Sequence, residues 1–168
     1  MGLLDILQHY ADGAAQSPPA PGPVQDHFDA VSKQASPTDL GGGLAAAFRS
    51  DATPPFGQMV SELFNRSNPQ QQAGLLNQLV QSLGPAVISS IAGGVLGKLG
   101  HGGAGAVTPE QASQVPPTVV ADIATHAEKQ DASIIDKVGG FYAQHPTLVQ
   151  TLGAAAMAMA MSHMSRRA

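Results

Sequence analysis

The chain contains no cysteine and no tryptophan, and aromatic residues make up only 4% of its 168 residues. The lack of cysteine excludes disulfide bonds and thiolate chemistry. Charged residues are scarce as well, at 12%, which is about half the usual quarter. A net charge of −4 without clustered lysine and arginine argues against nucleic acid as a partner.

Glycine and proline are plentiful instead, with 19 and 13 residues. Alanine, leucine, valine and methionine must therefore form the core, and such small side chains require close approach of the backbones. Apolar residues recur at spacings of three and four, whereas no segment alternates as a strand would. The pattern predicts an all-α fold, a bundle of about seven to nine helices.

Helix starts are marked by a capping residue followed by proline, a combination that favours the first helical turn. We expect the glycines 41–43 to interrupt or delay the helix in which they lie. We also expect Thr147 to cap the last helix. The expected helices are 2–11, 24–34, one after Ser36-Pro37 toward Arg49, one after Thr53-Pro54, one after Asn68-Pro69, 85–99, one after Thr108-Pro109, one after Pro116-Pro117, one from Asp131 or Ser133, and one from Thr147 to about Ser165.

The sequence predicts three parts. Residues 1–12 form an amphipathic N-terminal helix, residues 13–23 form a linker rich in proline and alanine, and residues 24–168 form a helical domain. Proline lacks the backbone donor and restricts its neighbours. The N-terminal helix is therefore expected to be tethered to the body rather than continuous with it.

Two hexapeptides nearly repeat, LVQSLG at 79–84 and LVQTLG at 148–153. Each follows a proline pair and an amphipathic segment, which suggests two diverged helical repeats at 54–100 and 116–165. Chance similarity between helices of simple composition is the other interpretation. The proline pairs are 62 residues apart and the hexapeptides 69, so a duplication needs an insertion in the second copy.

No catalytic, cofactor-binding or metal-binding set is predicted. The stretch GGVLGKL at 93–99 lacks the first glycine and the serine or threonine that a phosphate-binding loop requires. Asp122 and His126 lie one helical turn apart, but two ligands do not make a metal site. We therefore expect no enzyme activity, no cofactor and no metal.

Small and methionine-rich helix faces point instead to self-association. Small residues spaced by four let helices approach closely, and methionine supplies adaptable apolar surface. We expect a non-enzymatic structural protein that forms a homo-oligomer or filament. The candidate association residues are Leu3, Leu7, Tyr10, Gly93, Gly97, Ala154, Met157, Ala158, Met161 and Ser162.

The alternative is a peripheral membrane or lipid-binding protein whose N-terminal helix enters the interface. That helix lacks the lysine and arginine that such helices usually carry. A regulatory partner of another protein is a third interpretation. Two segments without charge, 67–97 and 139–165, reach membrane-spanning length but contain polar residues and proline. The N-terminus has no positive region before its apolar residues, so a cytoplasmic protein is expected.

The opening MGLLDIL, together with HGGAGAVTPEQ at 101–111, resembles the YidB-like family of small bacterial proteins of unknown function. Members are rich in glycine and helical, and carry a tryptophan before a glycine-rich turn and a helix start. The turn and the helix start are similar here, whereas the tryptophan is missing. The resemblance implies a helical bacterial protein and no catalytic residues.

Overall fold

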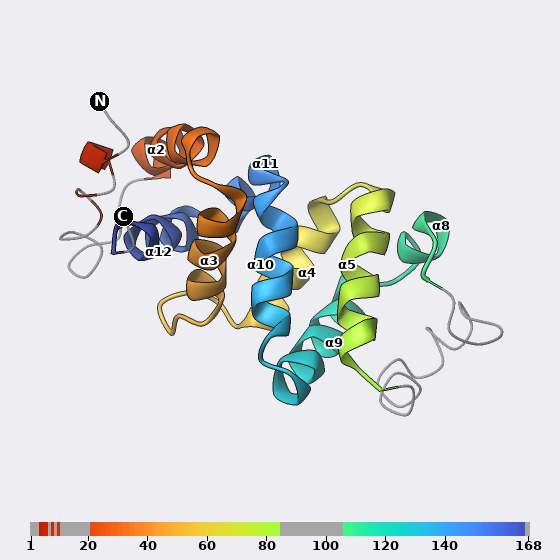
Figure 1. Ribbon diagram of the computed structural model, residues 1–168. Coiled ribbons are helices and arrows are strands. Elements are labelled where there is room, and N and C mark those ends of the chain that lie inside the picture. Colours follow the sequence, from red (N-terminus) through yellow and green to blue (C-terminus); the bar gives the residue numbers. More distant parts are fainter. Residues whose placement is uncertain (1–3, 7, 9, 11–20, 85–105, 167–168) are drawn as a thin grey trace. The chain divides into compact units, whose positions relative to one another are not determined.

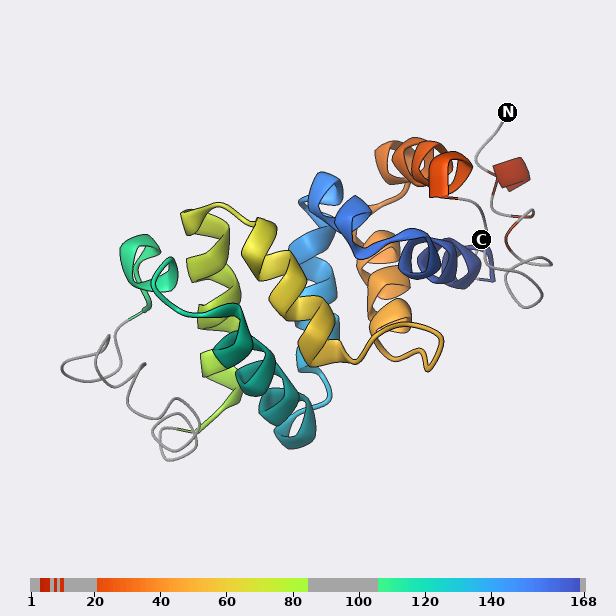
Figure 2. The same ribbon diagram turned by 180° about the vertical axis from the view of Figure 1, so that it is seen from behind.

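The computed structural model describes residues 4–6, 8, 10, 21–84 and 106–166. These residues contain nine α-helices and one 3₁₀ helix, and no strand occurs among them (Figures 1 and 2). Residues 4–6, 8 and 10 are also helical. The prediction of an all-α fold is confirmed.

The helices keep the labels of Figure 1. Two of them, α8 and α11, are single turns of four residues. The elements are α2 (Pro21–Gln34), α3 (Pro37–Phe48), α4 (Phe56–Arg66), α5 (Pro69–Ser82), α8 (Pro109–Ala112), α9 (Pro117–Gln130), α10 (Ile134–Ala143), α11 (Pro146–Val149), the 3₁₀ helix η1 (Gln150–Leu152) and α12 (Ala154–Ser165).

The chain divides into two compact units. Unit 1 comprises Met1–Pro55 and Ile135–Ala168, and unit 2 comprises Phe56–Ile134. The division falls inside the second predicted repeat, 116–165, so the repeats and the units do not coincide. The duplication stays a prediction.

In unit 1, α12 packs against α3 and α2. The glycines of α3 allow the backbone of this helix to approach the backbones of its neighbours closely. A β-carbon on Gly43 would lie 2.7 Å from the carbonyl oxygen of Ala160, and one on Gly41 would lie 3.2 Å from Cα of Gly140 in α10. Gly41 and Gly43 do not interrupt α3, and this expectation was wrong: neighbouring backbones occupy the space of the missing side chains.

In unit 2, α4 packs against α9, and α5 contacts α8 and α9. The crossing of α4 and α9 depends on Gly57, because a β-carbon there would lie 2.6 Å from the carbonyl oxygen of Ala121. The side chain of Asn77 in α5 makes two hydrogen bonds to the backbone of Val107, one as donor and one as acceptor. Its Nδ2 donates to the Val107 carbonyl (3.2 Å), and its Oδ1 accepts from the Val107 amide (2.7 Å). This side chain joins α5 to the chain entering α8.

Three predicted helix starts are confirmed with their caps. Ser36 accepts a hydrogen bond from the amide of Asp39. Asn68 and Thr108 each begin a reciprocal capping box with a glutamine three residues later. These side chains satisfy amide groups that have no partner within the helix.

Other boundaries differ from the sequence-based expectation. Thr147 does not cap the last helix, because α11 already begins at Pro146 and the chain breaks again at Gly153 before α12. Thr53 lies before α4, which begins at Phe56, and donates to the carbonyl oxygen of Ser50 (2.9 Å). The helix α2 begins at Pro21, within the predicted linker, because proline fits the first helical turn.

The two near-identical hexapeptides have different local structures. Residues 79–82 are the last four of the long helix α5, whereas residues 148–152 form the end of α11 and all of η1. Burial differs at the first two positions, where Leu79 is buried in the first copy and Val149 in the second, whereas the fifth position is buried in both, as Leu83 and Leu152. Gly153 has φ of 91°, whereas Gly84 has no positive φ. Sequence similarity therefore does not extend to conformation.

Candidate association surface

The structure places the candidate residues of α12 inside unit 1. Ala158 is 3% exposed, and Ser162, Met157 and Met161 are also buried, whereas Ala154 is half-buried. The partners of this helix are α3 and α2 of the same chain. The four buried side chains thus serve packing within the protomer, and of the α12 candidates Ala154 keeps part of its surface exposed.

Four other candidates, Leu3, Leu7, Gly93 and Gly97, lie outside the described residues. The predicted helix 85–99 lies outside them as well. Of the N-terminal candidates the structure therefore describes Tyr10.

Within unit 1, the N-terminal helical residues carry two buried side chains. Ile6 is 6% exposed and Tyr10 is 5% exposed. The hydroxyl of Tyr10 and Nδ1 of His27 in α2 are hydrogen-bonded at 2.9 Å. The two rings meet edge to face with their centroids 5.8 Å apart. Tyr10 is thus an anchor that fixes this helical segment to α2.

Burial raises the pKa of the Tyr10 hydroxyl above 10.0. A raised pKa in the docked state means that docking favours the neutral phenol. The contribution is complete below pH 10.0 and is lost as the pH rises through the raised pKa. The Tyr10 phenol is therefore neutral in the docked segment throughout the neutral pH range.

Leu4, in contrast to Ile6 and Tyr10, is exposed. It is 59% exposed, and among the described residues it is the exposed large apolar side chain. Scattered single apolar residues are ordinary on protein surfaces. Leu4 differs because it lies on the same helical segment as the buried Ile6 and Tyr10, so this segment carries both buried and exposed apolar side chains.

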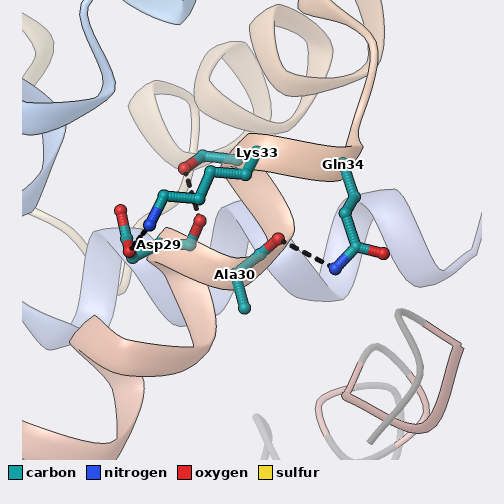
Figure 3. A network of polar contacts seen from close by, with 5 residues as sticks. Asp29, Ala30, Lys33 and Gln34 are labelled. Carbon is teal, nitrogen blue, oxygen red and sulfur yellow. Dashed lines mark hydrogen bonds and ion pairs between the residues drawn. The ribbon is translucent and has the colours of Figure 1, made fainter.

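The helix α2 that receives Tyr10 also carries polar contacts of its own, shown in Figure 3. Nζ of Lys33 donates to the carboxylate of Asp29, and Nε2 of Gln34 donates to the carbonyl oxygen of Ala30. All four residues belong to α2. Such contacts one turn apart support the helix modestly. The buried apolar side chains of α2 are Val24, Phe28 and Val31.

Asp122 and His126 lie one turn apart in α9. His126 uses Nδ1 to contact the backbone carbonyl of Asp122 at 2.9 Å, so the carboxylate and the ring are not brought together by this contact. No group of three potential metal ligands occurs in the described part of the chain. Among those residues, no helix has the length and apolar character needed to cross a bilayer.

Sequence reasoning missed His27 and the roles of Gly41 and Gly43. His27 and Tyr10 are 17 residues apart and belong to no motif, so no pattern could pair them. The glycine run did contain a signal, because glycine inside an apolar helix often marks a close backbone approach. The prediction used helix propensity alone, which treats glycine only as a residue that destabilises a helix.

No protein-family model, curated protein or solved structure matches this chain. The similarity to the YidB-like family therefore stays a resemblance in two short segments.

Proposed function

We propose that this chain is a non-enzymatic structural protein that assembles with copies of itself through its N-terminal helical segment. The exposed side chain of Leu4 is the observation that carries the proposal. The small-residue and methionine faces of α12 are occupied within unit 1, so they are not available for the contact. In the described part of the chain, Leu4 is the large apolar side chain that is more than half exposed.

A lipid surface is the competing partner for the same segment. Insertion of the whole apolar face would remove Ile6 and Tyr10 from their buried positions and break the Tyr10–His27 hydrogen bond. Association with another protomer through Leu4 leaves these contacts in place. Self-assembly therefore requires no buried contact to be broken, whereas insertion into lipid does, and self-assembly is the function we favour.

Sedimentation velocity over a range of micromolar concentrations tests the proposal. We expect the wild-type chain to form oligomers and Leu4→Asp to sediment as a smaller species with unchanged helical circular dichroism. Gln8→Asp, at an exposed position of the same segment, is the matched control and should assemble normally.

Wild-type protein that sediments as a monomer throughout would overturn the proposal. Flotation with vesicles of phosphatidylglycerol and phosphatidylcholine separates the two partners. Binding of monomeric protein to these vesicles, abolished by Leu4→Asp, would favour the lipid alternative instead.

A further inference from the structure

We infer that the two units of this chain stabilise each other through their two chain connections, so that unfolding of one unit weakens the other. Unit 2 is an insertion between the two parts of unit 1. The first connection follows Pro55, and the second precedes Ile135. Unit 1 therefore folds only when two parts of the chain that flank unit 2 come together. This coupling is independent of self-assembly.

Unit 2 keeps its own two ends near each other. Gly57, at the start of this unit, lies against α9, because a β-carbon there would collide with the hydroxyl of Thr125. After α9 the chain turns at once, since the amide of Ile134 donates to the carbonyl oxygen of Asp131 (3.0 Å). The start of unit 2 is thus packed against the helix from which its end leaves.

Unit 1 also keeps its two connection points together. Arg49, before the first connection, forms a two-point ion pair with Asp136, after the second. Nη1 of Arg49 lies 3.0 Å from Oδ1 of Asp136, and Nη2 lies 2.8 Å from Oδ2. The buried Thr53 donates to the carbonyl oxygen of Ser50 (2.9 Å), which holds the first connection near the end of α3.

Chain entropy then couples the units. With unit 2 unfolded, bringing the two parts of unit 1 together closes a loop of about 80 residues, whereas with unit 2 folded the loop corresponds to about 10 residues. A shorter loop closes more readily, so folding of unit 2 should raise the folding equilibrium constant of unit 1 about twentyfold. Linkage makes the effect reciprocal, so folding of unit 1 stabilises unit 2 by the same factor.

The coupling reaches the N-terminal helical segment. The helix α2, which carries His27, belongs to unit 1. Its surface holds Tyr10 through the hydrogen bond and the ring contact. Unfolding of unit 2 should therefore loosen the docking of Tyr10, although every residue of this contact lies in unit 1.

Amide hydrogen exchange in the full-length chain tests the coupling. Gly57→Leu should unfold unit 2, because a larger side chain does not fit where α4 crosses α9. Leu76→Asp, at a fully buried position of α5, is a second variant with the same purpose. In either variant, protection of the α3 and α12 amides should fall about twentyfold. Gln58→Leu, at an exposed position of α4, is the matched control and should leave both units protected.

A second measurement lengthens one connection and leaves both units intact. About 40 glycine and serine residues inserted between Pro55 and Phe56 should lower protection of the α3 and α12 amides about tenfold, because the loop that unit 1 closes grows from about 10 to about 50 residues. The same residues added after Ala168 lengthen no loop and should leave this protection unchanged.

Two kinds of result would overturn the coupling. When unit 2 unfolds, a fall in α3 and α12 protection of less than about threefold would mean that the units are independent, and one of more than about a hundredfold would mean that they unfold as one cooperative unit. An insertion after Pro55 that has no more effect than the C-terminal extension would contradict the role of the connections.

Discussion

Gly139 of α10 lies so close to Gly41 of α3 that a β-carbon on Gly139 would be 2.7 Å from the Gly41 carbonyl oxygen. The same β-carbon would lie 3.2 Å from the amide nitrogen of Ala45. Both neighbours are backbone atoms in a helix and have little freedom to move. Contact between α3 and α10 therefore depends on the absence of a side chain at this position.

Substitution of the adjacent glycines Gly139 and Gly140 by alanine should therefore change the free energy of unfolding differently. Gly139→Ala should lower the free energy of unfolding by about 1–3 kcal/mol, as overpacking does. Gly140→Ala should be neutral or raise it by about 0.5–1 kcal/mol, because its β-carbon meets nothing within 4 Å and alanine is the better helix former. Urea unfolding of both variants provides the test. Equal losses would contradict the proposed close contact.

The paired hexapeptides provide a second test. Gly153 has φ of 91°, a region that side chains rarely adopt. Gly153→Ala should therefore cost about 1–2 kcal/mol of folding free energy, although its β-carbon would meet no atom within 4 Å. Gly84→Ala, at the matching position of the other hexapeptide, should cost less than half as much. Thermal unfolding monitored by circular dichroism measures both, and similar losses would mean that the two turns share one conformation.

Ala158→Glu should unfold unit 1 rather than separate assembled chains. Ala158 is 3% exposed on a helix packed against α3 and α2, and an unpaired buried charge costs several kcal/mol. Ala155→Glu is the matched control because residue 155 is exposed on the same helix, and it should remain folded. Helical circular dichroism and sedimentation together decide the result. A helical, dissociated Ala158→Glu protein would restore α12 as an association surface.

The ion pair between Arg49 and Asp136 predicts a pH dependence. Nη2 of Arg49 lies 2.8 Å from Oδ2 of Asp136, and the hydrogen bond from Arg49 holds the pKa of Asp136 below its ordinary 3.8. Because the pKa is lowered by folding, the stabilisation is complete above pH 3.8 and is lost as the pH falls through the lowered pKa.

Substitution of Asp136 should therefore lower the free energy of unfolding only at a pH above its lowered pKa. The side chain of Asp136 is 58% exposed, so solvent screening limits the effect of Asp136→Asn to less than about 1 kcal/mol at pH 7. Urea midpoints of the variant and the wild type should converge as the pH falls through the lowered pKa of Asp136. A difference that persists there would mean that the substitution acts through packing rather than charge.

Much of the fold was predictable because it depends on local chemistry. The starts at Ser36, Asn68 and Thr108 follow from side chains that cap backbone amides within three residues of their own position. The break at Gly153, between η1 and α12, was not predicted. Glycine permits the φ of 91° at this position, but a glycine in an apolar segment does not by itself specify that the helix stops there.

The candidate association residues likewise combine features that the sequence predicts with features that depend on packing. Periodicity identified the small and methionine-rich face of α12 and the amphipathic N-terminus. It did not distinguish a face that packs within the chain from one left for a partner, because both are apolar. Burial of Ala158 and exposure of Leu4 are properties of the packed chain.

The sequence by itself determined that this protein is helical, where several helices begin, and that its helices must approach closely, since those properties follow from apolar spacing, capping residues and small side chains. Tertiary structure alone decided that Gly41 and Gly43 lie against other backbones, that Tyr10 meets His27, and that two nearly identical hexapeptides adopt different conformations. The physical reason is that these contacts join residues distant in the chain. Their free energy depends on which surfaces meet, and a local pattern does not contain that information.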